Sequence, residues 1–286
     1  MEYAMECLLY KTALIALEAG DVVLKYYGLE DFDLKQDSSP LTKADLESNA
    51  LIMQKLQEIS SYKVCSEEAV LEYEERKGLE YFWLIDPLDG TKDFLAQNGG
   101  FTINIALIYK NRPILGVVYA PAFSKLYIAL KDFGSFDYDV KSLEESWQKG
   151  MLDLAWLEQN KIRLNGERIA QEKQIIACDS VFHSTQATQD FISKYHLKVQ
   201  KYGSSLKICA LAKGEADIYP RFNGTSEWDI AACEIVLEES GGVVLDCVSK
   251  KPLAYNKESF RNNHFVAFAK SQVGKEIYQD ILNTDF

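Results

Sequence analysis

The chain has 286 residues, of which 47% are hydrophobic and 12% aromatic, so it can bury a sizeable core and is too apolar for a disordered protein. Its 43 acidic residues outnumber its 31 basic residues, and the net charge of −12 argues against long nucleic acids and anionic membrane surfaces as partners. A phosphorylated ligand would therefore need metal ions or a local basic pocket.

Cysteine usage and the N-terminus indicate the compartment. The six cysteines form no C-x-x-C pair, and most lie in apolar strings such as "IIAC" and "KICAL", so we expect buried reduced thiols. The first 20 residues lack the basic start of a signal peptide, and four charged residues interrupt their apolar pattern. No segment reaches the ~18 consecutive apolar residues of a membrane span. We therefore expect a cytoplasmic protein, leave peripheral attachment to an inner membrane open, and favour a monomer.

In chain order, the first expected element is an amphipathic helix that ends near Gly28. A polar loop or hairpin follows, and then a helix that begins near residues 43–45 and ends near residue 59. "YKVCSEEA" and the apolar run "YFWLI" are expected to be strands. Four further runs, separated by short turns, predict an antiparallel meander: "GFTINIALIY", "PILGVVYAPA", "KLYIAL" and "GSFDYD". Residues 141–160 are expected to form an amphipathic helix.

From about residue 174 the pattern changes, and strand-like segments alternate with helix-like ones. The expected strands are "QIIACD", "KVQKYG", "EADIYPRF" and "GGVVLD", and the expected helices between them are "TQATQDFISKYHL", "SSLKICALAKG" and "WDIAACEIVLEES". Such alternation is typical of α/β packing. We therefore predict an α/β protein with an α+β N-terminal half, residues 1–160, and an α/β C-terminal half, residues 161–286.

Two carboxylates, Asp86 and Asp89, directly follow the buried run "YFWLI" in the string "IDPLDG". Asp, Pro and Gly are turn formers, so a simple turn at the end of a strand would explain the string. Two like charges on one turn repel each other, however, and a fold tolerates that repulsion when a cation lies between them. This string therefore indicates either a turn or a cation site, and the rest of the chain has to decide.

Three more acids lie where apolar runs begin or end: Glu67 in "KVCSE", Asp45 in "PLTKAD" and Asp229 in "SEWDIAAC". Each alone could be a surface acid or a helix cap. Together with Asp86 and Asp89 they indicate a magnesium site, because Mg2+ prefers oxygen ligands. Asp86, Asp89 and the Leu88 carbonyl could hold two ions. Ions held about 4 Å apart can activate a water and stabilise the leaving oxygen of a phosphate ester.

Other kinds of site have less support. The chain has only three histidines, which disfavours zinc hydrolases and catalytic Ser-His or Cys-His pairs, and it contains neither G-x-x-x-x-G-K-[ST] nor G-x-G-x-x-G. Thr91 follows Gly90, and its hydroxyl could orient an attacking water if Asp45 accepts a hydrogen bond from it. The backbone N–H groups of Gly90 and Thr91 could cradle a phosphate.

Four strings in chain order, "PLTKAD", "CSEEA", "IDPLDGTKDFL" and "EWDIAACEIVLEESGG", resemble the signatures of the inositol monophosphatase superfamily of magnesium-dependent, lithium-sensitive phosphatases. The resemblance extends over nearly the whole chain. It implies a layered αβαβα sandwich, two or three Mg2+ ions and inhibition by Li+. It also implies a catalytic group formed by Glu67, Thr91 and Asp45. The metal ligands that it implies are Glu67, Asp86, the Leu88 carbonyl, Asp89 and Asp229.

Two further strings, "YGSSLKICALAKGEADIYPRF" and "KPLAYNKESFRNNHFVAF", resemble one branch, the 3′(2′),5′-bisphosphate nucleotidases of the CysQ type. That branch hydrolyses adenosine 3′,5′-bisphosphate (PAP) to AMP and so removes a by-product of sulfate assimilation. We expect metal ligands mostly in the N-terminal half and substrate recognition in the C-terminal half. The expected substrate contacts are Glu67, Leu88, Asp89, Gly90, Thr91, Ser204, Ser205, Lys207, Arg221 and Asp229.

The chain departs from the family pattern at three places. Cys233 stands where the family usually has glycine, residues 131–168 are longer than expected, and "CDSVFHS" matches loosely, so His183 is assigned no substrate role. An inositol or sugar monophosphatase is the first alternative function. A sensor that binds nucleotide bisphosphates without turnover and an exonuclease for very short oligonucleotides are the others. The Thr91, Asp45 and Glu67 set argues against the sensor, since binding alone needs no group that activates water.

Overall fold

The computed structural model describes residues 2–29, 32–34, 40–140, 154–168 and 174–284. Its N-terminal elements are α1 (Glu2–Tyr26), β1 (Phe32–Leu34), β2 (Pro40–Thr42), α2 (Lys43–Ile59), β3 (Lys63–Ser66), α3 (Tyr73–Arg76), β4 (Tyr81–Asp89) and α4 (Thr91–Leu95). The central elements are β5 (Thr102–Tyr109), β6 (Arg112–Ala120), η1 (Pro121–Phe123), β7 (Lys125–Leu130), β8 (Gly134–Asp139), α6 (Leu154–Asn160) and β9 (Ile162–Leu164). The C-terminal elements are β10 (Ile176–Ser180), α7 (Gln186–Lys194), β11 (Lys198–Tyr202), α8 (Leu206–Lys213), β12 (Ile218–Arg221), α9 (Glu227–Glu239), β13 (Val243–Asp246), β14 (Phe265–Phe268), η3 (Lys270–Gln272) and α10 (Glu276–Asn283).

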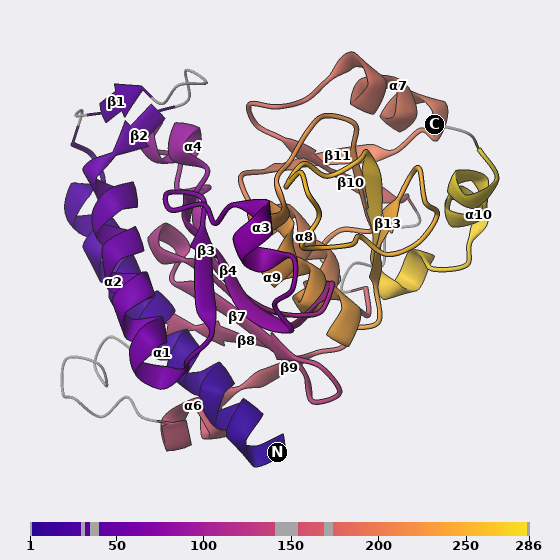
Figure 1. Ribbon diagram of the computed structural model, residues 1–286. Coiled ribbons are helices and arrows are strands. Elements are labelled where there is room, and N and C mark those ends of the chain that lie inside the picture. Colours follow the sequence, from indigo (N-terminus) through magenta and orange to yellow (C-terminus); the bar gives the residue numbers. More distant parts are fainter. Residues whose placement is uncertain (1, 30–31, 35–39, 141–153, 169–173, 285–286) are drawn as a thin grey trace.

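The elements stack in five layers that can be followed across Figure 1. Helices α1 and α2 cover one face of a seven-stranded sheet with the order β3-β4-β5-β6-β7-β8-β9. Helices α8 and α9 lie between this sheet and a five-stranded sheet with the order β11-β10-β12-β14-β13. Helices α7 and α10 pack on the outer face of the smaller sheet. The predicted α/β class and αβαβα sandwich are confirmed.

Strand β4 explains how one apolar run serves two layers. Phe82 and Leu84 belong to the core shared with α8 and α9, whereas Trp83 and Ile85 belong to the core shared with α1 and α2. Because helices cover both faces of the sheet, both sets are buried and the strand reads as a continuous apolar run. The pairing of β4 with β5 becomes irregular between Asp86 and Asp89. Such an irregularity bends a strand and changes the direction of its side chains, here at the two acids.

The smaller sheet is mixed. Strand β10 runs parallel to β11 and β12, as the alternating pattern predicts, whereas β14 runs antiparallel to β12 and β13. The carboxyl ends of parallel strands lie at one edge of a sheet, where the loops that follow them gather. The loops after β10, β11 and β12 therefore lie together and face the end of β4.

Most predicted elements are confirmed, among them the first helix, the hairpin β1–β2, helix α2 and the antiparallel meander β5–β8. Of the helix predicted over residues 141–160, residues 141–153 lie outside the described part, and α6 is helical. The short elements that were not predicted include α3, α4 and β9. Strand β9 pairs with β8 in the larger sheet. The predicted division of the chain into two halves at residue 160 stays a prediction. Within the described ranges, no helix is both long and apolar enough to span a membrane.

Candidate active site

A cavity of about 500 Å³ lies where the end of β4 meets the loops of the smaller sheet and the first turn of α9. Its lining includes two charged groups, to which we give names. The acidic cluster is Glu67, Asp86, Asp89 and Asp229. The basic set is Lys92, Lys207, Arg221 and Arg261. Acids and bases that converge on one cavity suit a ligand that carries both a metal-binding group and a further negative charge.

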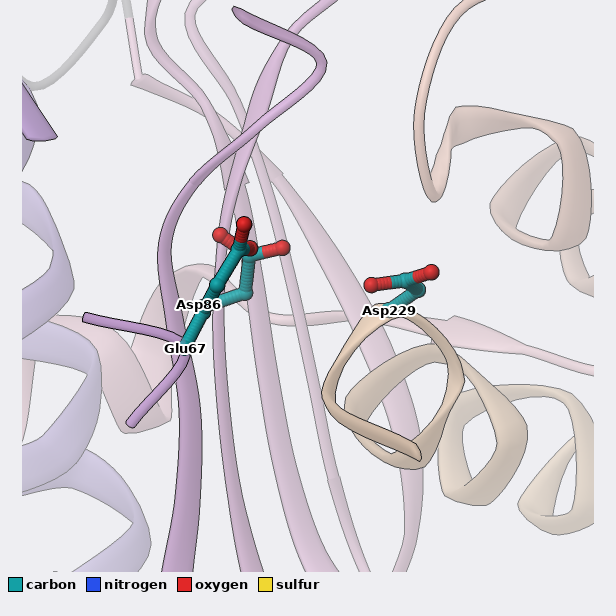
Figure 2. A group of neighbouring side chains, drawn as sticks. All are labelled: Glu67, Asp86 and Asp229. Carbon is teal, nitrogen blue, oxygen red and sulfur yellow. The ribbon is translucent and has the colours of Figure 1, made fainter. Parts of the chain in front are cut away.

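Three members of the acidic cluster lie close enough to share one cation. Glu67, Asp86 and Asp229 each offer a carboxylate oxygen, and these oxygens lie within 4.8 Å of one another. Figure 2 shows Glu67 and Asp86 side by side, with Asp229 facing them from α9. The Glu67 N–H donates to the Ile85 carbonyl at 3.1 Å, which holds the end of β3 against β4. Two adjacent strand ends and one helix start thus place the three carboxylates.

The electrostatics of this cluster fit a bound cation. Burial raises the pKa of Asp86 well above its usual value, and the negative charges of Glu67, Asp89 and Asp229 raise it further. Burial likewise raises the pKa of Asp229, with Asp89 and Glu67 as the next causes. Buried carboxylates that repel one another are stabilised in their charged form by a divalent ion with oxygen ligands. The donor set, which consists of carboxylates without histidine or thiolate, suits Mg2+ better than zinc.

Asp89, the fourth member, is held by side chains from both halves of the chain. Its carboxylate accepts hydrogen bonds from the Ser204 hydroxyl and from Asn104 Nδ2 at 3.3 Å. The Ser205 hydroxyl lies 3.4 Å from the same carboxylate and 2.9 Å from the Asp229 carbonyl oxygen. Gly90 follows with a φ of +89°, a left-handed conformation that glycine adopts without a steric penalty. This turn leads directly into α4, so that Leu88, Gly90 and the first residue of α4 all line the cavity.

Two acids of the site are also helix caps. Asp45 and Asp229 each occupy the third position of a helix and complete a capping box, with Thr42 in α2 and with Ser226 in α9. The Thr42 N–H donates to Asp45 Oδ2 at 2.7 Å, and the Ser226 N–H donates to Asp229 Oδ2 at 2.8 Å. The interpretation of Asp229 as a cap is therefore confirmed. A capping bond engages one oxygen of a carboxylate and fixes the direction of the other.

Thr91 is the first residue of α4, and its Oγ1 lies 3.4 Å from Asp45 Oδ1 and 3.4 Å from the Leu88 carbonyl oxygen. Asp45 is 1% exposed and lies behind Thr91 rather than in the cavity wall. The capping box leaves Asp45 Oδ1 directed at the Thr91 hydroxyl. The threonine and aspartate that the sequence suggested as a pair are thus adjacent.

The basic set shapes the other part of the cavity. Lys207 is 6% exposed, and burial lowers its pKa, while the charge of Asp89 opposes that shift. Arg221 is half-buried, and its Nε is buried without a hydrogen-bond partner among the described residues. Burial, followed by the positive charges of Lys92 and Arg221, lowers the pKa of His183 to about 4. This histidine is therefore neutral at pH 7, and the positive charges around it favour an anionic ligand.

The predicted site residues come together in space, although their roles stay predictions. All but Asp45 line the cavity: Glu67, Asp86, Leu88, Asp89, Gly90, Thr91, Ser204, Ser205, Lys207, Arg221 and Asp229. The sequence reasoning missed Lys92 and Arg261, and it left His183 without a role. Lys92 could have been found, because it directly follows Thr91. Arg261 could have been found from the string "KPLAYNKESFRNNHFVAF", which contains it and resembles the nucleotidase branch. In the fold its guanidinium lies against Gly224, where an added Cβ would be 2.0 Å from it.

The fold and this cavity define a class of proteins. The chain belongs to the inositol monophosphatase family, whose members are metal-dependent phosphatases, and residues 5–281 match it. Its similar relatives include proteins named 3′(2′),5′-bisphosphate nucleotidase CysQ. The protein of that name from Escherichia coli K12 is 36% identical over 258 residues, which cover 88% of this chain and 95% of the relative. The one from Buchnera aphidicola is 36% identical over 245 residues, 83% of each protein.

Comparison with a solved structure supports the same family assignment. The crystal structure of CysQ from Bacteroides thetaiotaomicron, a bacterial member of the inositol monophosphatase family, superposes with a TM-score of 0.80 at 35% identity. The superposition covers 94% of this chain and 97% of that one. The sequence resemblance to this family and to its nucleotidase branch is therefore confirmed.

Proposed function

We propose that this protein is a magnesium-dependent 3′(2′),5′-bisphosphate nucleotidase that converts adenosine 3′,5′-bisphosphate and water to AMP and inorganic phosphate. The observation that carries the proposal is the 34–36% identity to relatives of that name over most of the chain. The cavity supports it, because it combines a carboxylate cluster for metal with positive side chains for a second phosphate. A substrate with two phosphates uses both features, whereas a simple monophosphate uses only the first.

Within this proposal, the acidic cluster and the carbonyl of Leu88 hold two or three magnesium ions. Bound Mg2+ would neutralise the cluster, polarise the phosphate that is cleaved and lower the pKa of a nearby water. The carboxylates keep their positions through bonds to the protein itself, such as the capping bond to Asp229 and the bonds to Asp89. The ions would thus meet ligands that are already oriented, which reduces the reorganisation needed for binding.

Thr91 and Asp45 orient the water that attacks phosphorus. Asp45 Oδ1 and the Leu88 carbonyl oxygen each lie 3.4 Å from Thr91 Oγ1, and both can only accept. With the carbonyl assigned to the metal, the Thr91 hydroxyl donates its proton to Asp45 Oδ1. The lone pairs of Thr91 Oγ1 then accept a proton of the water and direct its oxygen towards the phosphate. Glu67, half-buried at the end of β3, completes the catalytic group beside them. The backbone N–H groups of Gly90 and Thr91 would contact the phosphate that is cleaved.

Substrate recognition is assigned to the basic set and to the start of α8. Lys207 and Arg221 would bind the phosphate that stays on the nucleotide, or the nucleotide that carries it. The unpartnered Nε of Arg221 supports this, because a buried guanidinium N–H without a partner is costly until a ligand accepts from it. The Ser204 hydroxyl already bonds to Asp89 and the Ser205 hydroxyl to the Asp229 carbonyl oxygen, so their substrate contacts would use backbone N–H groups.

Inhibition by lithium, which rests on the family resemblance, belongs to the same proposal, as do a cytoplasmic location and a monomeric state. A small phosphorylated nucleotide is the expected partner. The net charge of −12 supports this choice over a long nucleic acid.

A phosphate-release assay over four substrates tests the proposal. Adenosine 3′,5′-bisphosphate, its sulfated precursor, inositol 1-phosphate and fructose 1,6-bisphosphate are compared with Mg2+ and with excess chelator. We expect the highest kcat/KM for adenosine 3′,5′-bisphosphate, and no turnover in chelator. Preference for inositol 1-phosphate would replace the nucleotidase by a monophosphatase of the same family. Full activity in chelator would contradict the magnesium requirement.

A further inference from the structure

Ser204 has a backbone conformation that a serine rarely adopts. It lies in the turn between β11 and α8, with a φ of +49° in the left-handed region. A residue with a Cβ loses free energy there relative to glycine, and such positions persist only where the surrounding structure compensates. Gly203 directly precedes it. If this segment had to form only a turn, a glycine at position 204 would adopt the same φ without strain. A contact of the serine side chain should therefore compensate for the strained backbone.

The Ser204 hydroxyl lies at the centre of a hydrogen-bond network around Asp89. It bonds to the Asp89 carboxylate and lies 3.1 Å from the Asp89 carbonyl oxygen. It also lies 2.6 Å from the Thr102 hydroxyl. A hydroxyl has one proton, and a carboxylate can only accept, so Ser204 donates to Asp89. The Thr102 hydroxyl, which also lies 3.0 Å from Asn104 Oδ1, donates either to that oxygen or to Ser204. Asn104 donates to the same carboxylate oxygen at 3.3 Å.

This network crosses from one half of the chain to the other. Asp89, Thr102 and Asn104 lie on β4 and β5 of the larger sheet, whereas Ser204 follows β11 of the smaller one. The crossing depends on a close backbone approach, since a Cβ on Gly203 would lie 2.1 Å from the carbonyl oxygen of Gly100. Two glycines thus bring the turn against the larger sheet, and the strained conformation of Ser204 directs its hydroxyl at Asp89.

We propose that Ser204 is a positioning residue for the metal site: its strained turn holds a hydroxyl that fixes the orientation of the Asp89 carboxylate. The proposal rests on the proposed function, because it assigns Asp89 to the metal. Groups that orient a metal ligand raise affinity without touching the ion. On this account the backbone of Ser204 gives up some stability so that Asp89 is oriented before metal binds.

Four variants separate the hydroxyl from the backbone. Ser204→Ala removes the hydroxyl and keeps the strain, while Ser204→Gly removes both. Ser124 provides a matched control, because it also has a positive φ, +52°, in a turn between β6 and β7, and it is not among the described residues that line the cavity. Ser124→Ala and Ser124→Gly therefore change the backbone in the same way without the Asp89 contact. Each variant is titrated with Mn2+ while electron paramagnetic resonance measures the free ion, and each is melted in chelator.

We expect both Ser204 variants to bind Mn2+ about 10- to 100-fold more weakly than wild type, the usual effect of losing a group that orients a ligand. Both Ser124 variants should bind Mn2+ as wild type does. At each position the glycine variant should melt about 2–4 °C above the alanine variant, because glycine relieves the positive φ.

Mn2+ binding at wild-type affinity in both Ser204 variants would overturn the inference. So would weak binding in Ser204→Ala alone, because it would assign the effect to backbone strain rather than to the hydroxyl. A wild-type protein that binds no Mn2+ would instead contradict the proposed function. A kinetic readout adds a further check: the kcat deficit of both Ser204 variants should shrink as Mg2+ is raised, which a general folding defect would not produce.

Discussion

The acidic cluster and the basic set line the same cavity, but the fold holds them in different ways. Asp86 is 2% exposed within β4, Asp229 is fixed by a capping bond, and Asp89 is held by bonds from both halves. In the basic set, Lys92 and Arg261 are exposed and Arg221 is half-buried, and all three lie at element ends or in loops. Lys207 is buried, as Asp86 is, whereas Glu67, Asp89 and Asp229 are half-buried, as Arg221 is.

This difference suggests a division of labour. Groups that must hold an ion and a water in fixed geometry lie on rigid elements with short side chains. Apart from the buried Lys207, the groups that select among substrates are long side chains at element ends or in loops, where a change of residue leaves the fold intact. The acidic cluster should therefore matter for every phosphate ester, and the basic set only for substrates with a second anionic group. The predictions below test this distinction, beginning with the largest effect.

Asp89→Asn should remove nearly all turnover of every substrate, at least about 10³-fold, because a metal site loses one negative charge and an oriented ligand. Circular dichroism should show that the fold is kept, since asparagine has nearly the same shape. The matched control is Asp190→Asn, at an exposed aspartate of α7. Loss of activity on the bisphosphate alone would contradict the assignment of Asp89 to the shared chemistry.

Thr91→Ala should lower kcat about 10²-fold with little change in substrate binding, because an oriented nucleophile matters in the transition state. Thr91→Ser keeps the hydroxyl and should retain most of the activity. Asp45→Asn should show a related loss, and the double variant should be clearly less than additive. Two losses that multiply independently would mean that Thr91 and Asp45 do not act as a pair.

Arg221→Ala should cut kcat/KM for adenosine 3′,5′-bisphosphate by about 10- to 150-fold, since a hydrogen bond to a charged group contributes roughly 1.5–3 kcal/mol. The slow hydrolysis of adenosine 3′-monophosphate, which lacks the second phosphate, should change little. Arg163→Ala, at an exposed arginine of β9, serves as the control. An equal loss on both substrates would show that Arg221 supports the fold or the metal site instead.

The smallest effect concerns pH. The pKa values of Asp86 and Asp229 are raised in the folded protein, so the folded state binds more protons than the unfolded state above the usual carboxyl pKa of 3.8. Without metal, their contribution to stability therefore falls as pH rises from about 4 through the raised values. Because Mg2+ competes with those protons, its stabilisation should be larger at pH 8 than at pH 5.5. Melting curves with Mg2+ and with chelator measure this, and equal stabilisation at both pH values would contradict it.

Much of the fold could be predicted because its pattern is local. The buried run that became β4 and the alternating segments from residue 174 each carry enough apolar residues to indicate an element. Strand β9 could not be predicted: it has three residues, and its Ile162 is 61% exposed, so its place depends on pairing with β8. Helices α3 and α4 are one turn long and are stabilised by their surroundings rather than by propensity.

The site residues were likewise predictable where a local pattern marks them, and not where their place depends on distant parts of the chain. Asp86 and Asp89 were found because two acids after a buried strand are unusual within one short string. The bonds of Ser204 to Asp89 could not be predicted, since they depend on the approach of Gly203 to Gly100, about a hundred residues away in the sequence. Arg261 lies in a string that resembles the nucleotidase branch, but the string does not say which of its residues reaches the cavity, and only the folded chain shows that.

Crystals of the Thr91→Ala variant, grown with Mn2+ and adenosine 3′,5′-bisphosphate, test the central claim most directly. The substitution slows turnover, and the anomalous signal of manganese locates the ions. The account predicts manganese between Glu67, Asp86 and Asp229, the 3′-phosphate beside it, and the 5′-phosphate on Arg221. Manganese bound away from these carboxylates, or a nucleotide with its 5′-phosphate at the metal, would contradict the division between acidic cluster and basic set.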